Sequence, residues 1–307
     1  MFIIRHRKFF YTFSGLLGLA ALVSLFMWGL KPGIDFTGGS LLDVSFSSTA
    51  TSTAPTSDQV NQAVTALGIT DVSVRSAGTN EFIIRTPEIS NAQESQIIAA
   101  LSVNGNTAQA KEFDAVGPTL GAEALQKSWI SMVLVLLAIV FFITFAFRKV
   151  SKPVSSWWYG LIAVVALAHD VLIPTGVFAI LGHFAGIEVD TLFVTAVLVV
   201  LGFSVHDTIV VFDRVRENLR RNEEFKEKKD FDTIVGESIN QTFVRSINTS
   251  LTTLLAILVL YIIGPVATQN FALALLVGIT AGTYSSIFIG SPLLVTVYKH
   301  RLKKLAK

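Results

Sequence analysis

Long apolar stretches alternate with short polar or charged ones along most of the 307-residue chain. A helix needs about 20 mostly apolar residues to cross the hydrocarbon core of a bilayer. Six stretches satisfy this requirement, at residues 9–30, 129–147, 157–181, 190–213, 242–263 and 271–297. Since 51% of the residues are hydrophobic and only 15% are charged, the chain is too apolar for a soluble protein of its size. The pattern predicts an α-helical polytopic membrane protein with six transmembrane helices.

The positions of Lys and Arg predict which side of the membrane each connection faces. Basic residues gather in RHRK at 5–8, RKVSK at 148–152, seven positions between Arg214 and Lys229, and KHRLKKLAK at 299–307. The intervening stretches GHFAGIEVD and GPVATQN hold none. Because cytoplasmic loops carry an excess of Lys and Arg, both termini are expected in the cytoplasm. The apolar part of the first span is longer than a signal peptide's, so we expect an uncleaved anchor.

Residues 31–128 are polar and are expected to form one domain on the outer side. LLDVSF alternates as a strand does, and the pairs Thr56–Gln59 and Ser90–Gln93 have the spacing of helix capping boxes. With the further strands DVSVRS, EFIIRT and KEFDAVG, the order is β-α-β-β-α-β, which predicts an α+β ferredoxin-like extracytoplasmic domain. It holds no His and its carboxylates are scattered, so a binding or mechanical module is expected rather than an enzyme.

Glycine-rich sequences flank this domain at both membrane joints. KPGIDFTGGS places Asp35, Gly38 and Gly39 just after the first span, and VGPTLG places Gly117 and Pro118 before the second. Glycine permits tight turns with positive φ. The joints are either two ordinary turns or the hinges of a domain that tilts as one body.

Charged residues inside the spans need an explanation, because each costs ~2.5–3.5 kcal/mol at the centre of a spanning helix. Asp207 of the fourth span and Arg245 of the fifth lie at one depth, roughly 9 and 10 Å to the cytoplasmic side of the span centres. Asp170 lies near the middle of the third span. An opposite charge keeps a carboxylate ionised and ready to exchange a proton. We therefore predict that Asp207 faces Arg245 and that Asp170 is a second stop on a proton path.

Other polar residues accompany these charges. Helical spacing puts Ser204 and Thr208 on the side of Asp207, and Asn248 and Thr249 on the side of Arg245, with His169 and His206 next to the two acids. Histidine can carry protons near neutral pH. The alternatives are a static buried ion pair that fixes helix packing, and histidines that are only hydrogen-bonded. Asp213 and Arg214, at the cytoplasmic end of the fourth span, are expected to form a solvated cluster.

Several other chemistries are excluded or disfavoured. The chain has no cysteine, which excludes disulfides and thiolate metal sites, and its histidines and carboxylates lack the spacing of metal ligands. It contains no phosphate-binding G-x-x-x-x-G-K-[ST] loop. The net charge of +2 is a sum over two faces and predicts no nucleic-acid partner. No metal or cofactor is expected.

The connection between the fourth and fifth spans ends in an apolar pattern. Phe231, Ile234, Val235 and Ile239 recur at helical spacing. This pattern predicts an amphipathic helix that lies along the inner membrane surface before the fifth span turns in.

Taken in order, these motifs resemble one family. GIDFTGGS, VGPTLG, AHDVLIP, GFSVHDTIVVFDRVREN and SINQTFVRSINTS are similar to sequences of the bacterial SecF family, in the resistance-nodulation-division superfamily. The resemblance covers nearly the whole chain. It implies a proton-driven aid to secretion of unfolded preproteins, working with a six-span SecD-like partner beside the SecYEG channel in the bacterial cytoplasmic membrane. Protons would be the coupling ion.

The resemblance also assigns roles to residues. It implies that Asp207 is the proton-path acid, Arg245 its basic partner and Asp170 a further intramembrane acid. Asp213 and Arg214 match the end of the fourth-span motif. The chain departs from the family at His206, where many relatives carry Asn.

Two other functions stay open. The first is one half of a proton-coupled exporter of small solutes or drugs in the same superfamily, although such chains usually have twelve spans and larger outer domains. The second is a non-conducting scaffold of the translocon. In every case we expect residues 1–30 to hold the first span, 31–128 the outer domain and 129–307 a five-helix bundle.

Overall fold

The computed structural model describes residues 2–48, 55–78, 80–103, 106–147 and 154–305. Two compact units make up the chain. The helical unit comprises Met1–Leu30, Ile130–Ile187 and Leu192–Lys307, and the sheet unit comprises Lys31–Trp129 and Glu188–Thr191. The predicted cytoplasmic block at 148–152 lies outside the described residues.

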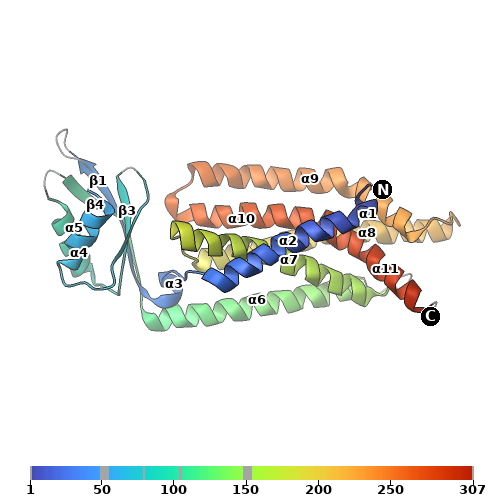
Figure 1. Cartoon of the computed structure of the whole chain (residues 1–307), viewed down its shortest axis with the longest axis horizontal. Helices are drawn as coiled ribbons and strands as arrows, with labels where there is room; N and C mark the ends of the chain where they lie inside the picture. Colours follow the sequence, from blue (N-terminus) through green and yellow to red (C-terminus); the bar gives the residue numbers. More distant parts are fainter. Residues whose placement is uncertain (1, 49–54, 79, 104–105, 148–153, 306–307) are drawn as a thin grey trace. The chain divides into compact units, whose positions relative to one another are not determined.

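Six helical segments of the described chain are long and apolar enough to cross a membrane, as the sequence predicts. They are α2 (Arg7–Trp28), α6 (Pro118–Ala146), α7 (Ser156–Ala185), α8 (Thr191–Glu224), α9 (Phe231–Ile263) and a sixth that combines α10 (Val266–Ser285), the π-helix η1 (Ser286–Gly290) and α11 (Ser291–Leu305). The short α1 (Phe2–Arg5) precedes α2. In the helical unit, α10 packs against α7 and α9, and α2 packs against α7 (Figure 1).

Small residues allow these helices to approach closely. A side chain at Gly176 of α7 would overlap Ala21 of α2, and one at Gly278 of α10 would overlap Val200 of α8. Membrane helices associate mainly through van der Waals packing, so such close contacts stabilise the bundle. The GITAG stretch at 278–282 thus has the packing role that its spacing suggests.

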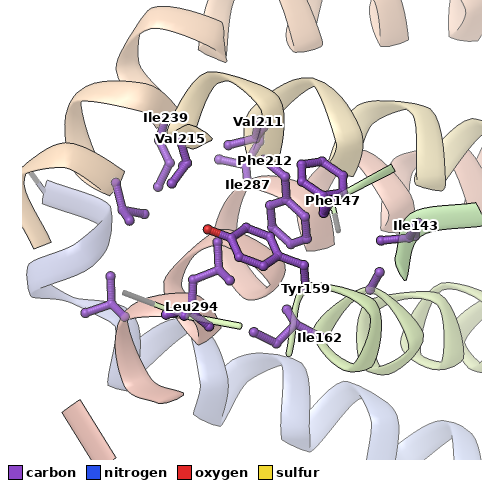
Figure 2. Packing of buried hydrophobic residues seen from close by; sticks show 14 of the residues in the cluster. Ile143, Phe147, Tyr159, Ile162, Val211, Phe212, Val215, Ile239, Ile287 and Leu294 are labelled. Carbon is purple, nitrogen blue, oxygen red and sulfur yellow. The ribbon is translucent and has the colours of Figure 1, made fainter. Parts of the chain in front are cut away.

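A cluster of large apolar side chains fills the helical unit around Tyr159 (Figure 2). The Tyr159 ring stacks on Phe147, with centroids 5.3 Å apart, and meets the Phe212 ring nearly at right angles at 5.2 Å. Tyr159 is 0% exposed, and its hydroxyl has no hydrogen-bond partner among the described residues. Figure 2 shows this hydroxyl pointing among apolar neighbours.

The sheet unit contains one antiparallel sheet with strand order β2-β3-β1-β4. The elements are α3 (Ile34–Thr37), β1 (Gly39–Ser48), α4 (Ser57–Thr65), β2 (Ser73–Ser76), β3 (Glu81–Thr86), α5 (Asn91–Leu101) and β4 (Asn106–Val116). From β1 to β4 they follow the predicted β-α-β-β-α-β order. The sheet and both helices enclose an apolar core of Leu42, Val44, Phe46, Val60, Val64, Phe82, Ile84, Ile97 and Leu101.

Both predicted capping boxes are present. The Thr56 side chain accepts a hydrogen bond from the Gln59 backbone N–H, and the Gln59 side chain returns one to the Thr56 backbone. Ser90 and Gln93 do the same at α5. Each box satisfies backbone donors that the first helical turn leaves free, which fixes where α4 and α5 begin.

The start of α9 corrects one prediction. The sequence predicts a separate surface helix over 231–239, but α9 runs unbroken from Phe231 to Ile263. Phe231 is buried against Tyr298 of α11, with ring centroids 4.8 Å apart, and Asp232 pairs with Lys299. The apolar face therefore packs on protein. Its periodicity indicates a buried face but does not distinguish lipid from another helix.

Candidate functional site

Asp170 lies at the middle of α7 and is 0% exposed. Its Oδ2 accepts hydrogen bonds from the Ser204 hydroxyl of α8 at 2.5 Å and from the Ser285 hydroxyl of α10 at 2.7 Å. Its Oδ1 lies 3.0 Å from Nδ1 of His169. Three helices thus supply partners to one buried carboxylate, as expected of a polar group that water cannot reach.

Gly282 allows α10 to approach α8 at this level. A Cβ on Gly282 would lie 3.0 Å from Cβ of Ser204, which is closer than ordinary packing. The absence of a side chain at Gly282 therefore leaves room for Ser204 beside Ser285, one turn along α10. The two serine hydroxyls can then converge on the same oxygen of Asp170.

Asp207 lies three residues after Ser204 on α8 and is 2% exposed. The hydroxyls of Ser246 on α9 and Ser286 on η1 lie near it, and the buried Ser246 hydroxyl has no hydrogen-bond partner among the described residues. Its Oδ2 has no hydrogen-bond partner among the described residues. Asp207 is therefore a second buried carboxylate, with a polar environment less complete than that of Asp170. The predicted neighbour Thr208 is also buried, and its methyl group packs against Gly290.

A π-helical turn joins the surroundings of the two acids. Ser285 ends α10 and donates to Asp170, whereas Ser286 begins η1, lies near Asp207 and donates to the Thr283 carbonyl at 3.1 Å. Ser291, the first residue of α11, follows this turn, and its hydroxyl donates to the Ser286 carbonyl at 2.9 Å. Isolated π-turns inside α-helices occur frequently at functional sites. The sequence carried no recognisable signal for this turn, and the prediction of the site did not include Ser285, Ser286 or Ser246.

His169 extends the polar group toward α2. Its Nε2 is buried and has no hydrogen-bond partner among the described residues. The Tyr284 ring lies 6.4 Å away between centroids, and the Ser14 hydroxyl of α2 donates to the Tyr284 hydroxyl at 3.2 Å. The structure therefore places His169 with Asp170, as predicted, and Tyr284 and Ser14 are further polar neighbours.

The predicted contact between Asp207 and Arg245 is wrong for this structure. Arg245 is exposed, and within the described residues it forms no ion pair with Asp207 or another carboxylate. The residue of α9 that lies near Asp207 is Ser246, which is buried. One position along a helix turns the side chain by about 100°, so the shift from 245 to 246 exchanges the outer face for the inner one.

The inner face of α9 carries small hydroxyl residues. Thr242, Ser246 and Ser250 are buried, and the Thr283 hydroxyl of α10 donates to Ser250 at 2.7 Å. This helical spacing of short side chains suits close packing against α10.

The predicted partners of Arg245 lie on the outer face. Asn248 is exposed and Thr249 is half-buried, and the Thr249 hydroxyl donates to the Arg245 carbonyl of its own helix at 2.9 Å. Arg245 thus lies on the outer face of α9 and not on the face that was predicted to meet Asp207.

His206 and the cytoplasmic-end motif also point outward. His206 is exposed beside the buried Asp207. Asp213 pairs with Arg216, and Arg214 pairs with Glu217 at 2.6 Å and donates to Gln241 at 2.6 Å. These are surface contacts of the kind predicted for Asp213 and Arg214. In the described residues no group of three or more His, Asp or Glu could hold a metal ion.

The two glycine-rich joints are packed together. Gly38 and Gly39 have φ of 75° and 121°, as the predicted tight turn requires. A Cβ on Gly38 would lie 2.8 Å from Cα of Pro118, and Gly117 precedes that proline. Asp35 instead accepts hydrogen bonds from Thr191. A hinge motion at these joints stays a prediction.

A family model described as "Protein export membrane protein SecD/SecF, C-terminal" matches residues 96–300, and a "SecD/SecF GG Motif" model matches residues 23–50. The chain is 41% identical to the protein translocase subunit SecF of Thermobaculum terrenum, over 96% of this chain and 93% of that protein. The chain belongs to the SecF family. SecF of Anaerolinea thermophila is a further relative, 39% identical over 95% of this chain and 92% of its own length.

Solved SecDF structures share the fold of this SecF family protein. A crystal structure of SecDF, a translocon-associated membrane protein from Thermus thermophilus, matches with a TM-score of 0.81 and 29% identity. The match covers 96% of this chain but 38% of that one. A SecDF crystal structure in the super-membrane-facing form matches with a TM-score of 0.64 and 27% identity, over 99% and 39% of the two chains. Six membrane helices with a small antiparallel sheet are thus the SecF arrangement.

Proposed function

We propose that this SecF family protein couples the proton-motive force to preprotein translocation and to release of the preprotein on the outer face of the membrane. The observation that carries the proposal is the pair of buried carboxylates, Asp170 and Asp207, which lie near consecutive serines of α10 and η1. Family membership supplies the transport context, and the buried acids supply a place where a proton can bind.

The surroundings of Asp207 favour exchange over a static structural role. A buried carboxylate that only braces helices is normally satisfied by cations or donors on both oxygens. Asp170 approaches that condition, with contacts to two hydroxyls and a ring nitrogen. Asp207 has an oxygen without a partner, and no cation lies within ion-pairing distance of it among the described residues. A proton is the smallest ligand that can remove the free-energy cost of the charge.

The energy available from a proton is sufficient for such a role. Moving one elementary charge through 100 mV releases about 2.3 kcal/mol. Two arrangements of one protein typically differ by a few kcal/mol, so one or two protons per cycle can change which arrangement is populated.

A SecD-like subunit completes the proposed assembly. SecDF chains carry a further part, because this chain covers only 38% and 39% of the two solved ones. The outer face of α9 presents Arg245 and Asn248 outside the helical unit, where the cost of burying them in lipid calls for a polar partner. In the proposed role the pair acts beside SecYEG on unfolded preproteins, in the bacterial cytoplasmic membrane with both termini inside.

Secretion by cells whose only SecF is a variant tests the proposal. We expect Asp207→Asn to slow preprotein export several-fold, because the amide keeps the size of the side chain but cannot bind and release a proton. Asp170→Asn is expected to slow export as well, because the amide cannot bind and release a proton either. Its oxygen can still accept hydrogen bonds from the Ser204 and Ser285 hydroxyls, which preserves the local packing. Glu217→Gln is the matched control, because Glu217 is an exposed residue of the same helix in a surface pair.

Copurification with the SecD-like subunit separates the outcomes. The proposal expects each variant to retain its partner while export slows. Normal export by Asp207→Asn would instead support a non-conducting scaffold. A deletion strain that becomes sensitive to toxic compounds before any preprotein accumulates would support a small-solute exporter.

A further inference from the structure

The connection between α7 and α8 is a built part of the sheet unit. Residues Glu188–Thr191 form this 188–191 segment, and their contacts assign them to the unit that holds the sheet. The helices that continue from its two ends carry Asp170 and Asp207. No structured element was predicted for this connection, so the contacts of the segment require an explanation.

The backbone of the segment pairs like a strand with residues that follow α2. Val189 and Pro32 form a parallel β-bridge. The Val189 N–H donates to the Lys31 carbonyl at 2.8 Å, and the Gly33 N–H donates to the Val189 carbonyl at 2.8 Å. Val189 is also buried. Two backbone hydrogen bonds around a buried residue fix the register of the segment.

Glu188 adds charged contacts to this pairing. Its Oε1 lies 2.7 Å from Nη1 of Arg85 and 3.4 Å from Nζ of Lys31. Arg85 belongs to β3, and its other nitrogen donates to the Thr37 hydroxyl at 2.8 Å. Glu188 is therefore connected through Arg85 to both the sheet and α3. Hydrogen bonds between charged groups are about twice as strong as neutral ones.

Asp35 holds the other end of the segment, where α8 begins. Its Oδ2 accepts from the Thr191 backbone N–H at 2.9 Å and from the Thr191 hydroxyl at 2.6 Å. Thr191 is the first residue of α8. A carboxylate at a helix N-terminus satisfies a free donor and interacts favourably with the helix dipole. Asp35, from a different part of the chain, thus fixes the position of the first turn of α8.

We propose that Asp35 and Glu188 are positioning residues that keep α8 attached to the sheet unit throughout the transport cycle. Asp207 lies 16 positions after Thr191 on the same unbroken helix, which corresponds to about 24 Å of rigid α-helix. A change in α8 when Asp207 gains or loses a proton then reaches the sheet unit through Thr191. This inference rests on the proposed proton coupling and names the residues that transmit it.

Export by full-length variants in the presence of the SecD-like subunit tests the role of Asp35. Asp35→Ala removes the acceptor and is expected to reduce export at least several-fold. Asp35→Asn retains an oxygen that accepts from Thr191, so we expect it to keep most of the export rate. Asp58→Ala is the control, because Asp58 is an exposed acid of the same unit in the first turn of α4. Equal losses in Asp35→Asn and Asp35→Ala would overturn the positioning role and indicate that the charge itself is needed.

A disulfide across the β-bridge tests whether the attachment must stay closed. Adjacent strands lie about 4.8 Å apart, within the Cα separation that a disulfide spans. Because the natural chain has no cysteine, Pro32→Cys with Val189→Cys introduces the only two thiols. In the Asp35→Ala background, oxidation is expected to restore export and reduction to abolish the rescue. Asp35→Ala without the cysteines, treated with the same oxidant, is the control.

Two results distinguish this inference from the proposed function. If oxidation of the double-cysteine chain that keeps Asp35 blocks export, the 188–191 segment has to open and this inference is wrong. That conclusion holds even if Asp207→Asn also fails to export, as the proposed function expects. If Asp207→Asn exports normally, the proton coupling is wrong, whatever the cross-link does. The membrane level of each variant and its copurification with the SecD-like subunit show whether a loss of export arises from misassembly. A loss of export that misassembly explains fully also contradicts the positioning role.

Discussion

Asp170 and Asp207 are the same type of residue on neighbouring helices, but their surroundings differ. Asp170 receives two serine hydroxyls and contacts His169, whereas Asp207 keeps one oxygen without a partner among the described residues. In an apolar interior the number of donors decides how costly the charge is. Under the proposed function, this difference favours Asp207 as the main site of proton exchange and gives Asp170 a more permanently hydrogen-bonded role.

Tyr159 illustrates an unsatisfied group without such a role. Its buried hydroxyl has no partner among the described residues, and an unmade hydrogen bond costs about 1–3 kcal/mol. We predict that Tyr159→Phe leaves the free energy of unfolding unchanged or raises it by about 1 kcal/mol. Thermal unfolding of the purified chain in detergent checks this, with Tyr261→Phe as the control because Tyr261 is partly exposed on α9. A clear loss of stability in Tyr159→Phe would show that the hydroxyl has a partner.

Asp43 gives a pH-dependent prediction outside the membrane spans. Burial on β1 and the nearby Glu81 raise the pKa of its carboxyl, against a smaller opposing effect of Lys111. The folded state therefore holds the Asp43 proton more tightly than the unfolded state does. Its contribution to stability falls as pH rises from the ordinary value of 3.8 through the raised pKa, so ionised Asp43 destabilises the sheet unit at neutral pH.

Asp43→Asn cannot ionise and should stabilise the sheet unit at neutral pH. Hydrogen–deuterium exchange of β1 and β4 in the full-length chain is the measurement, with variant and unmodified chain compared at each pH. We expect greater protection in Asp43→Asn at neutral pH, and a difference that disappears in acid. A difference that stays constant with pH would mean that ionisation of Asp43 is not its cause.

At the scale of whole elements, the sequence predicted the features that depend on local order. The capping boxes at Thr56 and Ser90 and the six long apolar helices depend on residues close together in the chain. The errors concern choices that depend on tertiary packing. The stripe that includes Arg245 and the stripe that includes Ser246 are both polar, and only packing against α10 decides which one is buried. Likewise, Asp35 and Thr191 are 156 residues apart, so no local pattern predicts their contact.

The packing of α8 against α10 can be tested by one substitution. A Cβ on Gly278 would overlap the Val200 side chain, so Gly278→Ala is expected to cost about 1–3 kcal/mol of stability through overpacking. Gly202→Ala makes the same change on α8 where no atom lies within 4 Å of the new Cβ. It should be neutral or stabilising by about 0.5–1 kcal/mol, because alanine favours helix. Thermal stability of the two purified variants in detergent compares them, and equal effects would contradict the close contact.

At the scale of the whole molecule, two compact units are connected by chain that is itself structured. The 188–191 segment belongs to the sheet unit although it joins two helices of the helical unit. The acids lie on those same two helices, so under the proposed function a change at either acid would reach the sheet unit through this segment. The family resemblance supplied the translocation role and the acids, whereas this route became visible only from the contacts.

The response of preprotein translocation to an imposed proton-motive force tests the central claim most directly. Inverted membrane vesicles containing the Sec translocase, the SecD-like subunit and either the unmodified chain or Asp207→Asn would be compared with and without the gradient. We expect the gradient to accelerate translocation with the unmodified chain and this acceleration to be lost with Asp207→Asn. An equal acceleration in both sets of vesicles would show that Asp207 does not couple protons to transport.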